Sequence, residues 1–285
     1  MGLRSPKSWV RIPPGPLLFS CSNDTELETR LYDSSTLNGI SERCDQGLVK
    51  YEKIGFPDRP ALSESLQKTV RKFVYDYFLE NERAPVIEEI MEKFHLDRMT
   101  AHQVFLGIEQ AHNLSLVPGT QRILMAHPFS AIASPFKVTI GPKTYYANCA
   151  WDSVAFHVML SQDIRVDSFC HHCAKPIKIN LDHGKAISNP PEPLVFLSMP
   201  ASKWWDNIVN TCSNSMVFFS SKQHLAEWQA RNPSATGEAL SIEKTVELSR
   251  PTYATRMELD FSRPPKEELM QRWASIGLKG DFWKL

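Results

Sequence analysis

The apolar positions after residue 60 recur at steps of three and four. This spacing predicts a helix over 61–80, a second over 85–94 and a third over 98–112, for which Asp97 is a suitable N-cap. The turn Pro118-Gly119 then separates two short apolar runs. Three helices followed by a hairpin are typical of a winged-helix domain. The apolar stripe of the first helix consists of Leu62, Leu66, Val70, Phe73 and Tyr77.

From residue 128 onward the apolar positions alternate with polar ones, which predicts strands. Helical stretches lie between these strands, so the pattern predicts an α+β fold with a mainly antiparallel sheet. The predicted strands cover 136–140, 144–149, 164–169, 177–181, 194–198 and 216–220. The predicted helices cover 150–160, 221–231, 241–248 and 265–276.

These patterns divide the chain into four parts. Residues 1–56 show no sustained period and are rich in Pro, Ser, Asn and Asp, so they are expected to be a disordered or loosely attached extension. Residues 57–127 form the predicted winged-helix-like domain, and 128–234 the mixed α+β domain. A helical extension is expected over 235–285.

Composition narrows the class of protein. The 285 residues contain 32 Lys and Arg against 32 Asp and Glu, a neutral balance that disfavours a protein built to coat nucleic acid. Six cysteines are too few for a disulfide scaffold. No apolar run reaches the ~18 residues needed to span a bilayer. We therefore expect a cytosolic protein with reduced thiols and no membrane association.

The pair Cys149 and Asp152 is the first candidate for chemistry. If a helix begins at Ala150, the two side chains share one helical face and can approach each other. A thiolate nearby raises the pKa of a carboxyl group, as a proton donor near neutral pH requires. The alternative is structural: Cys149 as a small buried hydrophobe and Asp152 as a residue of the helix N-terminus.

The other cysteines divide into two groups. Cys212 is flanked by Thr, Ser and Asn just before an apolar strand, and spacing alone cannot pair it with Cys149. Cys170-His-His-Cys173 is a dense cluster of soft ligands without the second CxxC of a zinc ribbon. It is either a reduced pair on a turn or a structural metal site. The possible co-ligands are His171, His172 and His183.

The predicted winged-helix-like domain lacks the charge of a DNA-binding module. Between residues 60 and 127 seven Lys and Arg stand against nine Asp and Glu, a net charge of −2. Phosphate neutralisation by a basic face supplies most non-specific DNA affinity. We therefore expect a structural or interaction role for this domain.

The segment Tyr146-Ala-Asn-Cys149-Ala-Trp-Asp152 resembles the active-site strand and helix of alkylmercury (organomercurial) lyases. The resemblance covers roughly residues 60–230. It extends backwards through His127-Pro-Phe-Ser to the three predicted helices, and forwards to His224-Leu-Ala-Glu-Trp228. It implies a winged-helix-like domain joined to an α+β catalytic domain. It also implies an enzyme of mercury detoxification that uses no organic cofactor.

The resemblance assigns roles to three residues. Cys149 and Cys212 correspond to the two cysteines that hold the substrate mercury, and Asp152 to the aspartate that delivers a proton to carbon. The implied reaction is protonolysis of the carbon–mercury bond, which releases a hydrocarbon and Hg(II). A small cellular thiol or a mercuric reductase would then accept the Hg(II).

Two features depart from the family pattern. One residue more than usual separates Cys212 from Phe218-Phe219, and a β-bulge would absorb it. Cys170 and Cys173 stand where the family often has one mainly structural cysteine. Two alternative functions follow: a metal-responsive winged-helix regulator with Cys170 and Cys173 as sensor ligands, and a non-catalytic soft-metal-binding relative.

Overall fold

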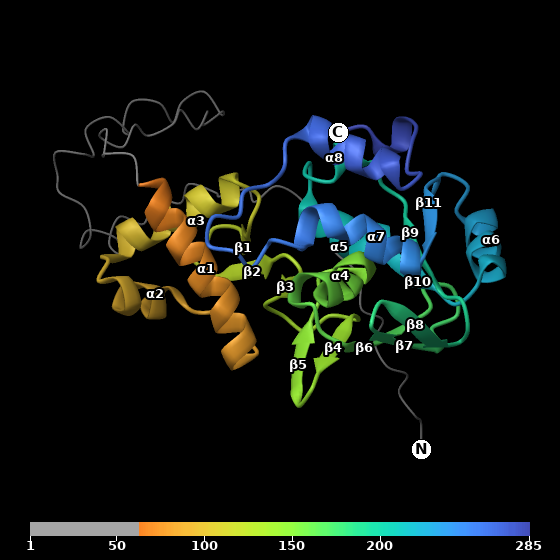
Figure 1. Cartoon of the computed structure of the whole chain (residues 1–285), viewed down its shortest axis with the longest axis horizontal. Helices are drawn as coiled ribbons and strands as arrows, with labels where there is room; N and C mark the ends of the chain where they lie inside the picture. The colour runs from red at the N-terminus through yellow and green to blue at the C-terminus, as the bar shows by residue number, and fades with distance from the viewer. Residues whose placement is uncertain (1–62) are drawn as a thin grey trace, which may run out of the picture. The chain divides into compact units, whose positions relative to one another are not determined.

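The computed structural model describes residues 63–285, which form an α+β fold (Figure 1). All of these residues belong to one compact unit. Helices come first along the chain, and a mixed domain with antiparallel sheets follows, so the predicted fold class is confirmed. The extension expected over 1–56, with Cys21 and Cys44, lies outside the described residues.

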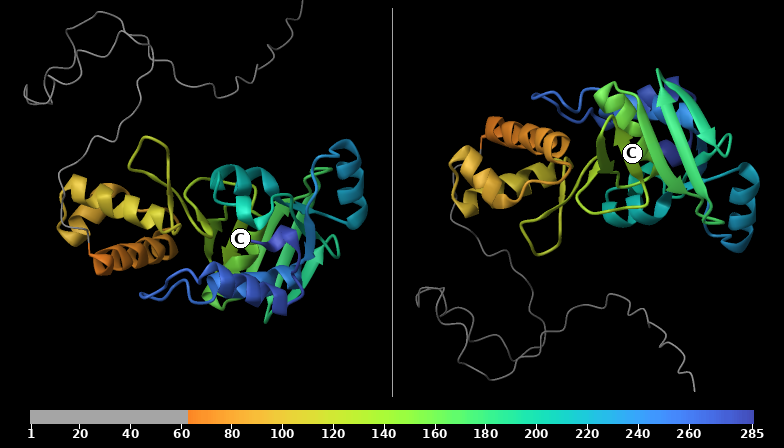
Figure 2. Two further views of the ribbon diagram at one scale, coloured as in Figure 1. Left: turned by 90° about the horizontal axis from the view of Figure 1, so that it is seen from above. Right: turned by 90° about the horizontal axis from the view of Figure 1, so that it is seen from below.

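Three helices open the described part of the chain and gather on one side of it (Figure 2). Side chains of Ser63 and Asp97 cap the first and third helices by accepting hydrogen bonds from backbone amides, at 3.2 and 2.9 Å. All three helices agree with the sequence prediction. They are α1 (Glu64–Asn81), α2 (Ile87–Phe94) and α3 (Arg98–Gln110).

A small antiparallel sheet follows, with strand order β1-β2-β3. The predicted hairpin is present, but the third strand was not predicted, because two residues are too few to show alternation. Assignment of the helices and this sheet to a winged-helix domain stays a prediction. The strands are β1 (Ser115–Leu116), β2 (Ile123–Ala126) and β3 (Phe129–Ser130).

The largest sheet has five antiparallel strands in the order β5-β4-β6-β7-β8. Its β7 alternates strictly between exposed and buried residues, as expected for a sheet with one solvated face. The last strand was not predicted and has no fully buried residue. The strands are β4 (Lys137–Ile140), β5 (Lys143–Tyr146), β6 (Ile164–Phe169), β7 (Pro176–Asp182) and β8 (Lys185–Asn189).

A second sheet of three antiparallel strands, in the order β10-β9-β11, lies deeper in the core. Every residue of β9 (Leu194–Leu197) and β10 (Met216–Phe219) is buried. Just before β11 (Glu238–Ser241), a Cβ on Gly237 would lie 2.1 Å from the carbonyl oxygen of Leu197. Only glycine allows this close approach of two backbones.

Two helices pack against each other in the centre of the unit: α4 (Ala150–Leu160) and α7 (Ile242–Tyr253). The indole of Trp151 donates a 2.9 Å hydrogen bond to the Ser249 hydroxyl across this contact. The prediction ended the second of these helices at residue 248, but it continues through Pro251. The lost backbone hydrogen bond is tolerated because the extra turn buries Tyr253.

Further helices surround this centre. Helix α5 (Ile208–Ser215) was not predicted, because its Asn, Ser and Thr residues favour caps and turns over helix interiors. Helices α6 (Lys222–Arg231) and α8 (Lys266–Ser275) agree with the prediction. Two short 3₁₀ segments complete the fold, η2 (Ala201–Lys203) and η3 (Asp281–Trp283).

The C-terminal segment is anchored by a tryptophan cluster. The ring of Trp273 lies 5.7 Å from that of Trp204 and 5.9 Å from that of Trp283, between ring centres. Trp204 also contacts Trp151 at 5.2 Å. Because these rings are almost fully buried, the cluster fixes α8 beside the start of α4.

We therefore expect Trp273→Ala to lower the free energy of unfolding by about 3–5 kcal/mol, through the lost burial and the remaining cavity. Chemical denaturation at neutral pH measures this change. Ile187→Ala is the control, because Ile187 is 68% exposed and its truncation should cost less than about 0.5 kcal/mol. Equal effects of the two substitutions would contradict the anchoring role of the cluster.

Candidate active site

The N-terminus of α4 positions the first two site residues. Cys149 is the N-cap, and its sulfur accepts a 3.3 Å hydrogen bond from the backbone amide of Asp152. Both side chains are 1% exposed. The local spacing seen in the sequence therefore does bring this thiol and this carboxylate together.

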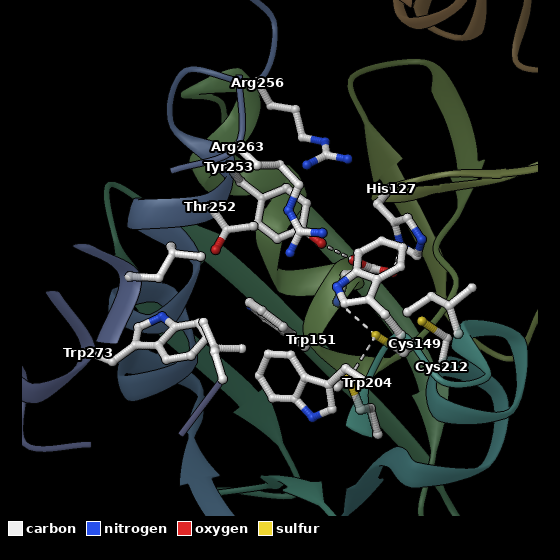
Figure 3. Close-up of a pocket in the computed structure, with 16 residues that line it drawn as sticks. His127, Cys149, Trp151, Trp204, Cys212, Thr252, Tyr253, Arg256, Arg263 and Trp273 are labelled. Atoms are coloured by element: carbon white, nitrogen blue, oxygen red, sulfur yellow. Dashed lines mark hydrogen bonds and ion pairs between the residues drawn. The ribbon is translucent and has the colours of Figure 1, made fainter. Parts of the chain in front are cut away.

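Cys212 reaches the same place from α5, 63 residues further along the chain. It is 3% exposed, and Figure 3 shows its sulfur close to that of Cys149. A third sulfur, that of Met216, lies 3.8 Å from Cys149 Sγ. Strand β10 pairs with β9 in regular register, so the β-bulge expected before Phe218 is absent. The residues between Cys212 and the start of β10 continue helix α5.

The carboxylate of Asp152 is held by three side chains that sequence reasoning missed as site residues. The Tyr253 hydroxyl donates a short hydrogen bond to Oδ1. The Asn148 amide donates to Oδ2 at 3.1 Å, and His127 Nδ1 lies 3.3 Å from the same oxygen. Only His127 and Asn148 stood within the segments that carried the family resemblance. Nothing in the sequence pointed to Tyr253, 101 residues beyond Asp152.

His127 carries positive charge beside Asp152 and Cys212. Burial disfavours the charged ring, but interactions with Asp152 and Cys212 raise the pKa of His127 to about 9. The ring is therefore an imidazolium at neutral pH. One nitrogen atom of His127, one oxygen atom of Asp152 and the Cys212 sulfur all lie within 4.8 Å of one another.

The two thiols differ in acidity. A hydrogen bond from Cys149 lowers the pKa of Cys212 below its ordinary value of 9.0, and the neighbouring His127 acts in the same direction against burial. Burial raises the pKa of Cys149 well above the ordinary value, and the charges of Cys212 and Asp152 add to this. The surroundings thus favour the thiolate at Cys212 and disfavour it at Cys149.

Aromatic side chains form the walls of the pocket that contains these groups. Its empty space, the mouth included, is about 550 Å³. Trp151 and Trp204 are buried in the wall, and the half-buried Trp205 lies nearer to solvent. Such walls exclude water from the thiols and present an apolar surface to a bound organic group.

Trp205 is clamped between distant parts of the chain. Its ring stacks on that of His112, which follows α3, at 4.1 Å between centres. Arg263 belongs to the C-terminal segment, and its guanidinium lies 4.5 Å from the centre of the Trp205 ring. The same guanidinium lies 3.0 Å from Nδ1 of His112. The pocket mouth is thus built by the N-terminal helices and the C-terminal segment together.

Behind the site, a buried arginine joins the same two parts of the chain. Arg256 donates a 2.8 Å hydrogen bond to the Tyr75 hydroxyl, which lies 2.8 Å from the backbone carbonyl of His127. Arg71 on α1 donates to the carbonyl oxygen of Arg256 at 2.8 Å. Tyr253 and Arg256 lie in one short segment, so this network also supports the residue that holds Asp152.

Cys170 and Cys173 lie in a separate cluster. Their sulfur atoms are 3.6 and 3.5 Å from Nδ1 of His224 on α6, a histidine that was not among the expected co-ligands. His183 instead groups with exposed carboxylates, and the ring of His171 packs on Phe219. His172 forms an ion pair with Glu227.

The fold and the site define a class: an α+β protein with a buried pair of thiols, a carboxylate and an imidazolium in one pocket. A sequence model of the alkylmercury lyase family matches residues 129–254. The matched region contains all three residues to which the resemblance assigned roles. Residues 129–254 therefore match the alkylmercury lyase family, which confirms the resemblance over that part of the chain.

Curated relatives agree with this assignment. The alkylmercury lyase of Bacillus cereus is 31% identical over 133 residues, which cover 47% of this chain and 58% of the relative. The enzyme of Staphylococcus epidermidis is 22% identical over 127 residues, 45% of this chain and 57% of that one. The chain thus spans little more than half the length of the curated relatives that it matches.

A solved structure, the mercury-bound form of MerB2, has a similar fold. The similarity covers 70% of this chain and 94% of the other, with a TM-score of 0.57 and 18% identity. This likeness concerns the fold alone.

Within residues 63–285 no helix is both long and apolar enough to cross a membrane.

The electrostatics of the site lead to a test in solution. An imidazolium beside a thiolate stabilises the charged sulfur, so its removal in His127→Gln should raise the pKa of Cys212. In the unsubstituted protein, this support should disappear as pH rises through about 9, where His127 loses its proton. Ultraviolet absorbance of the thiolate, with Cys212→Ser as the blank, measures the titration.

His183→Gln is the matched control, because His183 is exposed and lies in another cluster. Its thiolate titration should follow that of the unsubstituted protein. Identical titrations for His127→Gln and the unsubstituted protein would contradict the charge assigned to His127.

Proposed function

We propose that the protein is an alkylmercury lyase that cleaves the carbon–mercury bond of organomercurials by protonolysis, as part of mercury detoxification. One observation carries the proposal: Cys149, Asp152 and Cys212 line one pocket and are all buried, within the region that matches the alkylmercury lyase family. The substrate is an organomercurial cation, R–Hg⁺, delivered on a small thiol.

The difference in thiol acidity supports an order of events. Cys212, the more acidic thiol, is the group that first bonds to mercury, because a thiolate is the ligand that a soft metal prefers. The imidazolium of His127 balances its charge until mercury arrives. Cys149 follows as the second ligand and loses its proton as its sulfur bonds to the metal.

The proton of Cys149 is the one that the reaction needs. It passes to the carboxylate of Asp152 and from there to carbon, which takes up the electron pair of the breaking carbon–mercury bond. R–Hg⁺, one thiolate and one thiol thus become the hydrocarbon R–H and Hg(II) held by two thiolates. Atoms and charge balance, and mercury remains Hg(II) throughout.

The surroundings of Asp152 favour this relay. Burial raises the pKa of Tyr253 well above the ordinary value, so its hydroxyl stays protonated and donates to the carboxylate. Together with Asn148 it fixes the orientation of the carboxylate beside the two thiols. A fixed donor adds the rate advantage of proximity to that of general acid catalysis.

After cleavage, Hg(II) must leave the two thiolates. We propose a small cellular thiol or a mercuric reductase as the acceptor, and the cytosol as the compartment, because thiols are kept reduced there. We propose the mouth beside Trp205 as the route, since the half-buried Trp205 and Arg263 line the pocket together there.

We further propose that α1–α3 and β1–β3 form a winged-helix-like module with a structural role. Its charge of −2 disfavours DNA, and its residues contribute to the site instead. His112 supports the pocket mouth and Tyr75 contacts the backbone of His127.

Methane release from methylmercury in the presence of excess small thiol tests the proposed activity. Cys149→Ser and Cys212→Ser should each abolish it, and Asp152→Ala should lower the rate by about 10²–10⁴-fold, the usual contribution of a general acid. The two cysteine variants should differ in binding: Cys149→Ser still retains methylmercury through Cys212, whereas Cys212→Ser retains much less.

Cys44→Ser is the control for the serine substitutions, because it makes the same chemical change at a cysteine without a proposed role. Its turnover should match that of the unsubstituted protein. Normal methane release by Cys212→Ser would disprove the two-thiolate mechanism.

The proposed structural role of the N-terminal module predicts no gel-shift with random duplex DNA at physiological salt. The matched control is a variant with Glu88→Lys and Glu92→Lys, which makes the surface of α2 more basic and should increase any shift. A shift by the unsubstituted protein would favour a metal-responsive regulator instead.

A further inference from the structure

The second sulfur cluster of the protein lies where the turn between β6 and β7 meets the start of α6. The turn closes on itself, since the amide of Ala174 donates to the carbonyl of Cys170 at 2.8 Å. Ser221 caps α6 and directs its first turn toward the cysteines. Two segments about 50 residues apart thus bring Cys170, Cys173 and His224 together.

The distances within this cluster match those of a tetrahedral metal site. Zinc bonds of about 2.3 Å to sulfur and about 2.0–2.1 Å to nitrogen place the two atoms about 3.5–3.6 Å apart. The sulfur atoms of Cys170 and Cys173 lie 3.6 and 3.5 Å from Nδ1 of His224. All three ligand atoms lie within 4.8 Å of one another.

The surroundings resemble those of a metal-bound thiolate. The backbone amide of Ser220 donates to Cys170 Sγ at 3.4 Å, an interaction that supports a charged sulfur. Cys170 is buried, whereas Cys173 and His224 are half-buried, so the three ligands leave one side facing solvent. A fourth ligand from solvent completes a tetrahedron at that side.

The ligand types select the metal. Two thiolates and an imidazole suit a soft or borderline divalent ion such as Zn(II), and not Mg(II) or Ca(II), which take oxygen ligands. We propose that Cys170, Cys173 and His224 bind one Zn(II) per chain. The ion fixes the β6–β7 turn to β10 and α6.

This site is distinct from the proposed mercury pocket, which contains Cys149 and Cys212. Strand β10 lies between them: Met216 contacts Cys149 at one end, and Ser220, just past the other end, contacts Cys170. Four residues of strand correspond to about 13 Å. A single ion cannot bind to both sets of sulfur atoms, so the two sites can be tested separately.

Metal stoichiometry tests the proposal without reference to activity. The protein is stripped with a chelator under reducing conditions, loaded with Zn(II) or Co(II), and desalted. We expect one equivalent per chain, the thiolate–cobalt absorption of a tetrahedral site, and a higher Tm on loading. Cys170→Ser, Cys173→Ser and His224→Ala should each lose the tightly bound equivalent.

Three further variants make the test specific. The double variant Cys149→Ser, Cys212→Ser should keep the equivalent, since it alters only the mercury pocket. His183→Ala, in an exposed cluster, should keep it too. His224→Cys should restore binding that His224→Ala loses, because cysteine is also a zinc ligand, and this separates metal binding from misfolding.

Several results would overturn the proposal. These are less than one bound equivalent in the unsubstituted protein, full binding by Cys173→Ser and His224→Ala, or loss of binding in the mercury-pocket double variant. Binding of Hg(II) without any binding of Zn(II) or Co(II) would show a mercury-storage site instead of a zinc site.

Discussion

A buried carboxylate is the constraint on which much of this structure depends. Asp152 is 1% exposed, and an unpaired charge at that depth would destabilise the fold by several kcal/mol. The protein meets this demand with groups from three regions: His127 before the first large sheet, Asn148 at the start of α4 and Tyr253 at the end of α7. Those groups need support of their own, which Arg256, Arg71 and Tyr75 provide. The N-terminal helices and the C-terminal segment therefore contribute to the site as well as to the core.

The same constraint separates the roles of the two thiols. A carboxylate near two buried sulfur atoms disfavours thiolates at both, and the positive ring of His127 relieves this at Cys212 only. Cys149 lies at the N-terminus of a helix, where a thiolate is usually favoured, yet burial and the neighbouring charges outweigh that effect. In the proposed reaction, one sulfur atom therefore binds the metal first and the other supplies a proton, although their residue type is the same.

The sequence predicted best where a single local pattern determined the outcome. The start of α4 was predicted from the local pattern, and the approach of Cys149 and Asp152 follows from it; the N-cap at Asp97 was predicted in the same way. Cys212 could be paired with Cys149 only through the family resemblance, because its helix is built from poor helix formers. Tyr253 could not be found, since its contact with Asp152 depends on how α7 packs against α4. His224 was missed because it meets the cysteines only when two segments about 50 residues apart come together, and such a contact leaves no periodic signal in the chain.

The clamp around Trp205 has a consequence for the proposed reaction. Its ring is held between His112 and Arg263, so its position does not depend on a bound substrate. This part of the aromatic wall is therefore in place before an organomercurial arrives, and little of the binding free energy is lost in ordering it.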